Sequence, residues 1–305
     1  MIWDTQLSSK QITSLVADIY NVLESKQKID DSLIDEFTTK LNGLLKVRLS
    51  GEGREPALSM SSFGQPDRKL WYKINQPDKG EPLRGEVLLK FMYGDIIELL
   101  VLMLAKASGH DVKGEQDEVT TAGVVGHRDA IVDGVLVDVK SASSFAFDKF
   151  RYHKLESDDP FGYLDQLALY ITASQSDLDI KKSGAFIAVN KENGQLAVDV
   201  YNVNPAVDYT KEASRKRSML SEPTPPTRCY PDEEDGKSGN RKLGVNCSYC
   251  EFRETCWPGL RTFLYSGKPR FLTQVVREPD VMELKKDKQN GETTPSTKSN
   301  KEYTF

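Results

Sequence analysis

The chain has 305 residues, of which 38% are hydrophobic and 29% are charged, and its net charge is −5. This composition is typical of a folded globular protein with one elaborated domain or two smaller ones. The longest apolar stretch, residues 96–105, is too short to span a bilayer, and the N-terminus has no basic segment followed by an apolar run. We therefore expect a cytoplasmic protein in a reducing setting. The acidic balance neither favours nor excludes nucleic-acid binding, because a local basic groove can coexist with an acidic remainder.

Hydrophobic spacing and turn residues predict the elements in chain order. Helices are expected in residues 1–50, 83–108 and 162–174, and strands in 119–142, 185–189 and 196–201, the last two joined as a hairpin. Residues 204–246 are polar and proline-rich, which is typical of an irregular linker, and the polar tail after Pro279 is expected to be disordered. This order indicates a mixed α/β domain rather than a regular βαβ array.

A predicted hairpin contains the strongest local signal. Asp133-Gly134 between two β-branched runs predicts a two-residue turn, because both residues tolerate positive φ. Such a turn fixes the pairing of the two strands, and in this register Asp129 faces Asp138. The two side chains therefore fall on one face, with their Cβ atoms roughly 5 Å apart. Lys140 follows Asp138 by two residues and shares this face. The pairs nearer the turn are Val132 with Val135, Ile131 with Leu136, and Ala130 with Val137.

The facing carboxylates suggest metal chemistry. Two like charges opposite each other destabilise a hairpin, and Mg²⁺ or Mn²⁺, which prefer oxygen ligands, would remove that penalty. Such an ion lowers the pKa of a bound water and stabilises charge on a phosphoryl oxygen, while Lys140 orients the water or neutralises the phosphate. The alternative is an exposed hairpin edge with its charges in solvent. Other Asp/Glu-x-Lys triplets occur in the chain, but only Asp138-Val139-Lys140 has a second acid in register.

Four short motifs follow one another in a recognisable order. They are Gly94-xxx-Glu98, Gly126-x-x-Asp129, Asp138-x-Lys140 and Gln166-xxx-Tyr170. In this order the chain, over roughly residues 58–260, resembles the RecB-type branch of the PD-(D/E)XK nucleases, and more closely the CRISPR-adaptation nucleases and related phage exonucleases.

The resemblance implies a restriction-endonuclease-like α/β core with a mixed central sheet flanked by helices. It implies catalytic roles for Glu98, Asp129, Asp138, Lys140, Gln166 and Tyr170, and Mg²⁺ or Mn²⁺ held by Glu98, Asp129, Asp138 and the Val139 carbonyl. Without the resemblance, Glu98 could be a solvated residue on a core helix, and a plain amphipathic helix is the favoured interpretation of Gln166 and Tyr170. We expect a helical N-terminal extension (1–57), a nuclease core (58–203), a linker and four-cysteine element packed on it (204–278), and a disordered tail (279–305).

Two further segments are candidates for binding. Basic residues alternate with aromatic ones in Arg68, Lys69, Trp71 and Tyr72, a pattern that suits a single-stranded backbone with stacked bases. The alternative is a surface strand or helix whose aromatic rings are buried.

The four cysteines are Cys229, Cys247, Cys250 and Cys256, and their spacing favours one four-thiolate metal site over disulfides. Composition alone favours zinc, and a [4Fe–4S] cluster is chemically as acceptable. The resemblance favours the cluster, because the last three cysteines are similar to the trio that holds it in the related nucleases. The family's remaining cysteine precedes the core, in a segment like 63–66, where this chain has none, so Cys229 would replace it.

These inferences predict a Mg²⁺- or Mn²⁺-dependent deoxyribonuclease, with an exonuclease favoured by analogy within the branch. The expected partners are linear DNA ends or single-stranded segments, together with a recombination or CRISPR-adaptation protein, and the setting is the host cytoplasm if a phage encodes the chain. Two alternatives stay open: a non-catalytic DNA-binding module that retains the nuclease fold, and a zinc-stapled interaction scaffold.

Overall fold

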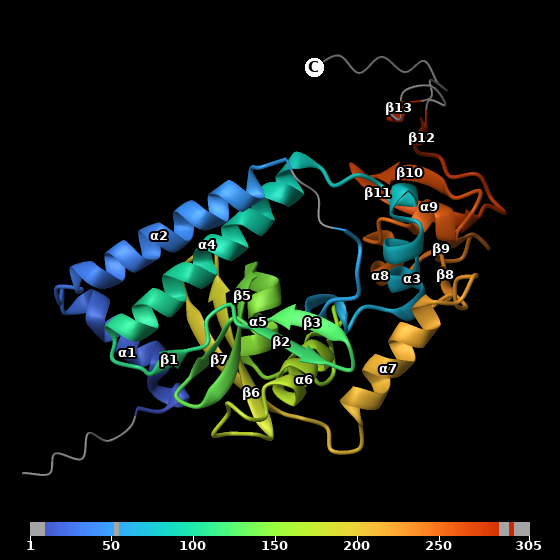
Figure 1. Cartoon of the computed structure of the whole chain (residues 1–305). Helices are drawn as coiled ribbons and strands as arrows, with labels where there is room; N and C mark the ends of the chain where they lie inside the picture. Colours follow the sequence, from blue (N-terminus) through green and yellow to red (C-terminus); the bar gives the residue numbers. More distant parts are fainter. Residues whose placement is uncertain (1–9, 52–54, 287–292, 296–305) are drawn as a thin grey trace, which may run out of the picture. The chain divides into compact units, whose positions relative to one another are not determined.

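The computed structural model describes residues 10–51, 55–286 and 293–295. The chain forms two compact units (Figure 1). Unit 1 contains residues 1–65 and 83–221, and unit 2 contains residues 66–82 and 222–305. Within the described ranges, no helix has the length and apolarity that a membrane-spanning segment needs.

Unit 1 is built on a five-stranded mixed sheet. Its helices are α1 (Leu15–Glu24), α2 (Asp31–Arg48), α4 (Gly85–Ala107), α5 (Ser144–Arg151), α6 (Tyr163–Ala173) and α7 (Tyr209–Leu220), with short 3₁₀ turns η1 (Ile12–Ser14) and η2 (Met60–Ser62). Its strands are β1 (Val112–Lys113), β2 (Glu118–Thr121), β3 (Val124–His127), β4 (Ala130–Val132), β5 (Val135–Ala142), β6 (Ser183–Asn190) and β7 (Leu196–Asn202). The strand order is β1-β4-β5-β6-β7, in which only β5 and β6 run parallel, while β2 and β3 form a separate hairpin. The predicted mixed sheet flanked by helices is confirmed.

The two faces of the sheet are covered by different helices (Figure 1). Alternate residues of a strand point to opposite faces, so β5 serves both. Val137 and Val139 pack with α1 and α4, whereas Leu136 and Ala142 pack with α5 and α6. Asp138 and Lys140 have the same parity as Leu136 and therefore belong to the face of α5 and α6.

The hairpin of β4 and β5 has the predicted register, with Val132 opposite Val135, Ile131 opposite Leu136 and Ala130 opposite Val137. Asp133 and Gly134 have φ values of 50° and 76°, the signs that a type I′ turn requires. A Cβ on Gly134 would lie 2.4 Å from a carboxylate oxygen of Asp179, so the turn also needs glycine for space. This turn sets which residues of β5 reach the face with the candidate site.

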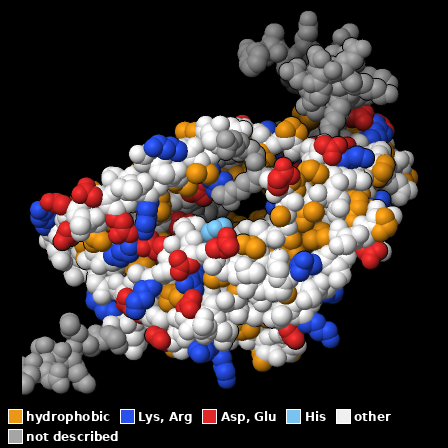
Figure 2. Space-filling model, in the orientation of Figure 1, with side chains coloured by type: hydrophobic (Ala, Val, Ile, Leu, Met, Phe, Trp, Pro, Cys, Tyr) orange, Lys and Arg blue, Asp and Glu red, His pale blue; other side chains and the backbone are white. Residues whose placement is uncertain are grey.

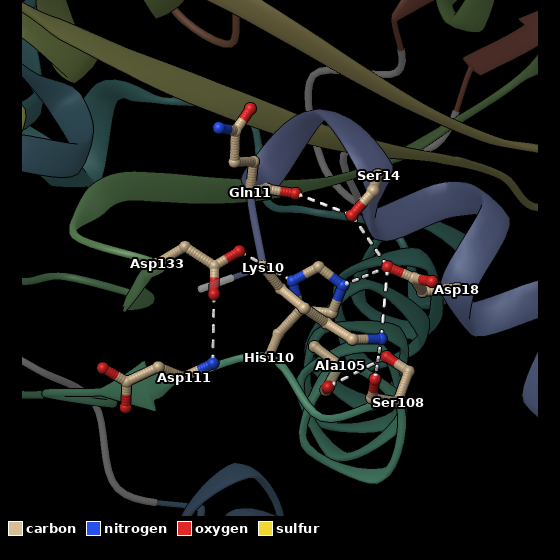
Figure 3. A network of polar contacts seen from close by, with 9 residues as sticks. All are labelled: Lys10, Gln11, Ser14, Asp18, Ala105, Ser108, His110, Asp111 and Asp133. Atoms are coloured by element: carbon tan, nitrogen blue, oxygen red, sulfur yellow. Dashed lines mark hydrogen bonds and ion pairs between the residues drawn. The ribbon is translucent and has the colours of Figure 1, made fainter. Parts of the chain in front are cut away.

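A polar network ties α1 to that turn (Figure 3). His110, which is fully buried, lies between two carboxylates: its Nδ1 is 2.7 Å from Asp133 Oδ2 and its Nε2 is 3.1 Å from Asp18 Oδ2. Lys10 forms an ion pair with Asp18 at 3.3 Å, and the backbone N–H of Asp111 donates to Asp133 at 3.1 Å. The network fixes the N-terminal helix to the sheet at the end far from Lys140 along β5.

Unit 2 has its own sheet. It contains α3 (Asp67–Asn75), η3 (Pro77–Lys79), α8 (Val245–Ser248) and α9 (Arg253–Cys256), with strands β8 (Asp232–Glu234), β9 (Arg241–Leu243), β10 (Arg261–Tyr265), β11 (Lys268–Gln274), β12 (Glu283–Lys286) and β13 (Thr293–Pro295). The strand order is β13-β12-β10-β11-β9-β8. The residues between the two strands of the tail, and those after β13, lie outside the described ranges.

Two predictions about local structure are wrong. The irregular linker contains a helix, α7, because Asp208 caps it by accepting a hydrogen bond from the Lys211 N–H and because Tyr209, Ala213 and Leu220 are buried at helical spacing. Apart from Pro205, which precedes the helix, the prolines of this segment begin at residue 223. The tail expected to be disordered contains β12 and β13, which extend the sheet of unit 2 by antiparallel pairing with β10 and with each other.

Candidate active site

Asp138 and Lys140 lie on β5, two residues apart on one face. Asp138 is 6% exposed, and its Oδ2 is 2.7 Å from Lys140 Nζ. Gln166 of α6, itself buried, donates its side-chain N–H to the same oxygen at 3.3 Å. Burial disfavours the ammonium charge of Lys140, but Asp138 and then Asp129 outweigh it and raise the lysine pKa. The lysine is therefore held as a cation beside a buried carboxylate.

Asp129 directly precedes β4, and its side chain replaces a backbone partner that β5 would have if β4 began earlier. Its Oδ2 accepts the backbone N–H of Val139 at 2.7 Å, which is the bond that a carbonyl of a longer β4 would otherwise accept. Burial raises the pKa of Asp129 well above its ordinary value, and the nearby Asp138 and Glu98 raise it further. The predicted facing pair of carboxylates is thus brought together, although Asp129 itself lies outside the ladder.

Glu98 reaches the same place from α4. Burial raises its pKa to about 7, with Asp138 and Asp95 adding to the effect, while a hydrogen bond from Gln116 lowers it. Gln116 Nε2 donates to Glu98 Oε1 at 2.6 Å. The negative charges of three side chains therefore interact around Lys140: Glu98 on α4, Asp129 just before β4, and Asp138 on β5.

Gln166 and Tyr170 both face the carboxylates from α6, one turn apart. Tyr170 is buried, and its pKa is raised by burial first and then by Asp138, Asp129 and Glu98. A Cβ on Gly126 would lie 2.6 Å from the Met60 Cβ and 2.9 Å from the Tyr170 ring, so the second motif needs glycine for close packing against the fourth. Gly94 of the first motif differs, since a Cβ there would meet no atom within 4 Å.

Two neighbours of the carboxylates were not found from sequence. Gln116 has φ 57°, and its backbone N–H lies 3.0 Å from the Arg128 carbonyl, which points its side chain at Glu98. Tyr163, the first residue of α6, places its ring centroid 4.6 Å from Lys140 Nζ. Neither residue belongs to a spacing pattern with the motif residues, so only the folded chain reveals them.

The donor set has the chemistry of a hard-cation site. Oxygen ligands that repel one another in a buried place suit Mg²⁺ or Mn²⁺, because a divalent cation offsets both burial and repulsion. As the side chains stand, no three His, Cys, Asp or Glu residues in the described part of the chain are arranged to hold a metal ion. Asp138 is instead paired with Lys140, and Asp129 with the Val139 N–H.

The binding candidates Arg68, Lys69, Trp71 and Tyr72 all lie in unit 2, on or within α3. Here the structure has the second alternative: Trp71 and Tyr72 are 3% and 5% exposed, so their rings are not accessible for base stacking. The Trp71 ring N–H donates to the Glu222 carbonyl, and Lys69 pairs with Glu251 at 3.0 Å. Arg68 Nε donates to Cys256 Sγ at 3.2 Å. These side chains hold α3 within unit 2.

All four cysteines also lie in unit 2, and none of them forms a disulfide. Cys229 is exposed and the other three are partly buried. Burial raises the pKa of Cys250 to about 11, and it raises that of Cys247, to which Cys256 and Cys229 contribute as neighbours. Cys247 thus lies near Cys256 and Cys229, although the four thiols as they stand are not arranged to hold a metal ion.

One face of the molecule is drawn in Figure 2. On this face, Lys and Arg side chains are scattered among Asp and Glu side chains rather than gathered in one basic patch.

Comparison with known proteins identifies no family. No protein-family model matches the chain, and no curated protein matches it at the required significance. Among solved structures, the chain is similar to SSO0001, with 17% identity over 73% of this chain and 96% of that one at a TM-score of 0.38. It is also similar to LHK-Exo in complex with dAMP, with 11% identity over 59% of this chain and 92% of that one at a TM-score of 0.36. Both TM-scores lie below 0.5, and the function proposed below rests on the geometry of the site.

Proposed function

We propose that the chain is a metal-dependent deoxyribonuclease of the PD-(D/E)XK type, with a restriction-endonuclease-like core in unit 1. The observation that carries this proposal is the convergence of Glu98, Asp129 and Asp138 on Lys140 from three separate elements. Phosphodiester hydrolysis needs a cation site and a fixed positive charge beside the phosphate. Asp138 is buried, and Glu98, Asp129 and Lys140 around it are partly buried; together these side chains offer both.

Each side chain has a role in this proposal. Glu98, Asp129, Asp138 and the Val139 carbonyl would hold the cation. When bound, Mg²⁺ or Mn²⁺ supplies a more acidic water and an electrostatic partner for the phosphoryl oxygen. Lys140 orients the attacking water and balances the charge that develops on the phosphate. Gln166 keeps Asp138 in place through its 3.3 Å contact, and Tyr170 packs against Gly126 beside the carboxylates.

An exonuclease that degrades linear ends is favoured by the motif resemblance described above. The test is digestion of end-labelled linear DNA and covalently closed DNA with Mg²⁺, Mn²⁺ or EDTA. We expect metal-dependent loss of the linear DNA, sparing of the closed circle, and no digestion by Asp138→Ala or Lys140→Ala.

A matched control is Lys149→Ala, which removes a lysine of the neighbouring α5 whose partner is Asp158, not a carboxylate of the site. Digestion of the circle would replace the exonuclease with an endonuclease. Full activity in both site variants would refute the assignment, and DNA binding without cleavage would favour a non-catalytic binding module.

We further propose that the four cysteines of unit 2 hold a [4Fe–4S] cluster. The thiol chemistry fits, and the Arg68 N–H that donates to Cys256 Sγ is the kind of contact that tunes a cluster. Protein purified without oxygen should be brown and absorb in the visible, with about four iron atoms per chain. A colourless protein with one zinc would establish the structural zinc site instead, and the interaction scaffold would then gain support.

A further inference from the structure

A row of aromatic rings leads from the candidate catalytic lysine to the surface. Lys140 Nζ lies 4.6 Å from the ring centroid of Tyr163, and the Tyr163 centroid is 5.5 Å from that of Phe161, with the rings tilted by 34°. On its inner side Tyr163 contacts Phe150 and Phe186, at 6.1 and 6.2 Å between centroids. Phe161 is 60% exposed, so the row ends on a ring open to solvent.

The backbone around Phe161 is fixed by two glycines. Gly162 has φ 72°, and a Cβ there would lie 2.1 Å from the Gly64 carbonyl oxygen. A Cβ on Gly64 would lie 1.9 Å from the Gly162 carbonyl oxygen, so the two backbones approach as closely as only glycines allow. Asp159 accepts the Leu164 N–H at 2.8 Å and holds the start of α6. An exposed ring on a fixed backbone loses little conformational entropy when a flat ligand stacks on it.

The charges around this ring favour an uncharged ligand surface. Asp158 and Asp159 precede it, and Asp158 is already paired with Lys149 at 2.8 Å. A phosphate beside Phe161 would be repelled by these carboxylates, whereas the face of a nucleobase carries no net charge. The cation that can accept the phosphate is Lys140, at the inner end of the row.

We propose that Phe161, backed by Tyr163, is a stacking platform for an unpaired nucleobase adjoining the phosphate that the site cleaves. This inference rests on the proposed nuclease function and deepens it, since a platform for a free base face selects a single-stranded or frayed end. Stacking needs only a π face and is therefore indifferent to sequence.

The test uses the full-length protein in Ca²⁺, which replaces Mg²⁺ to hold hydrolysis back, and single-stranded oligonucleotides with 2-aminopurine at the 5′ or the 3′ end. Stacking quenches the fluorescence of this base. We expect quenching with one of the two oligonucleotides and about tenfold weaker binding with little quenching for Phe161→Ala. Phe161→Trp, which retains a ring, should restore both. Phe145→Ala is the matched control, because Phe145 is 79% exposed on α5 and contacts Lys149 rather than Tyr163.

The outcomes separate the two proposals. If the protein binds DNA but Phe161→Ala quenches and binds like the unchanged protein, the platform is refuted and the nuclease proposal stands. An equal loss in Phe145→Ala would also refute it, as a general effect of removing exposed rings. If the folded protein digests linear DNA but binds neither oligonucleotide, the platform is refuted and the nuclease proposal stands, whereas a protein that neither binds these oligonucleotides nor digests linear DNA refutes both.

Discussion

At the scale of single residues, the ion pair between Lys140 and Asp138 allows a prediction of how substitution of Lys140 changes activity. The lysine charge is held by two carboxylates, and its partner oxygen also accepts from Gln166. Substitution of Lys140 by Met keeps the length of the side chain and removes only the charge. We expect kcat for linear DNA to fall by at least about 100-fold, with KM changed much less, because the charge acts on the transition state.

The measurement is steady-state kinetics on labelled linear DNA, with circular dichroism as the check on folding. Lys154→Met is a suitable control, since that lysine faces the ring of Tyr152 on the surface. A Lys140→Met variant that retains kcat would show that the lysine has no catalytic part.

Glu98 predicts a pH dependence of stability for the metal-free protein. Its pKa is raised by burial from 4.5 to about 7. Between these two pH values the folded state keeps a proton that the unfolded chain has released, so the free energy of unfolding falls as pH rises through this window. We expect Glu98 to contribute a decrease of a few kcal/mol from pH 4.5 to pH 7, so the decrease should be smaller by that amount in Glu98→Gln, in which the contribution of Asp129 remains.

Urea denaturation in EDTA across this pH range measures the effect as the difference between the two proteins. Added Mg²⁺ or Mn²⁺ should remove most of the difference at pH 7, because a cation stabilises the ionised carboxylate. Parallel pH profiles of the two proteins would contradict the assigned burial of Glu98.

At the scale of secondary-structure elements, two motif glycines have opposite requirements. Gly126 of β3 packs so closely against Met60 and Tyr170 that a methyl group cannot fit, whereas the surroundings of Gly94 in α4 are open. Gly126→Ala should lower the free energy of unfolding by about 1–3 kcal/mol through overpacking. Gly94→Ala should raise it by about 1 kcal/mol through better helix propensity.

Chemical denaturation of both variants measures these changes side by side. If Gly94→Ala is more stable yet less active, the open space beside Gly94 serves the substrate. A stable Gly126→Ala variant would contradict the close packing of β3 against α6.

His110 carries the attachment of α1 to the hairpin turn. Without the imidazole, the buried carboxylate of Asp133 keeps only the Asp111 N–H as a donor. We expect His110→Ala to destabilise the protein by about 2–4 kcal/mol, because a buried charge loses its partner. His127→Ala is the control, since that ring is half exposed. Thermal unfolding compares the two, and equal losses would contradict the role of the network.

The elements differ in how far the sequence predicts them. The turn at Asp133-Gly134 determines the register of β4 and β5, so the approach of Asp129 to Asp138 follows from local rules. The hydrogen bond from the Val139 N–H to the Asp129 side chain was not predictable, because it depends on the residue at which β4 begins. The convergence of Glu98 and Gln166 came only from the motif resemblance, since either residue alone fits an ordinary amphipathic helix.

Residues brought in by tertiary structure alone were missed. Gln116 and Tyr163 have no sequence spacing that links them to the carboxylates. Helix α7 was missed because prolines nearby dominated the composition of its segment, although Asp208 is a recognisable N-cap. For the aromatic residues of α3, alternation with basic residues was compatible with exposed and with buried rings, and the rings of Trp71 and Tyr72 are buried.

At the scale of the whole molecule, we expect loss of the proposed cysteine-bound metal centre to destabilise unit 2 and to leave unit 1 folded. The cysteines belong to unit 2, and the carboxylate site belongs to unit 1. Removal of iron with a chelator, or Cys250→Ser, should therefore increase amide hydrogen exchange in β9, β10 and β11, while β5 and β6 remain protected. Exchange followed by mass spectrometry measures both sets of strands in one sample, and equal deprotection of both units would show that they unfold as one.

The bond between Asp129 and the Val139 N–H has a practical consequence. An asparagine at position 129 still offers a carbonyl oxygen to that N–H, so Asp129→Asn would leave the edge of β5 with its acceptor. It would also remove one of the negative charges that repel each other there. If the chain is the proposed nuclease, Asp129→Asn should therefore stop hydrolysis without disturbing β5, which is what trapping a stalled substrate complex requires.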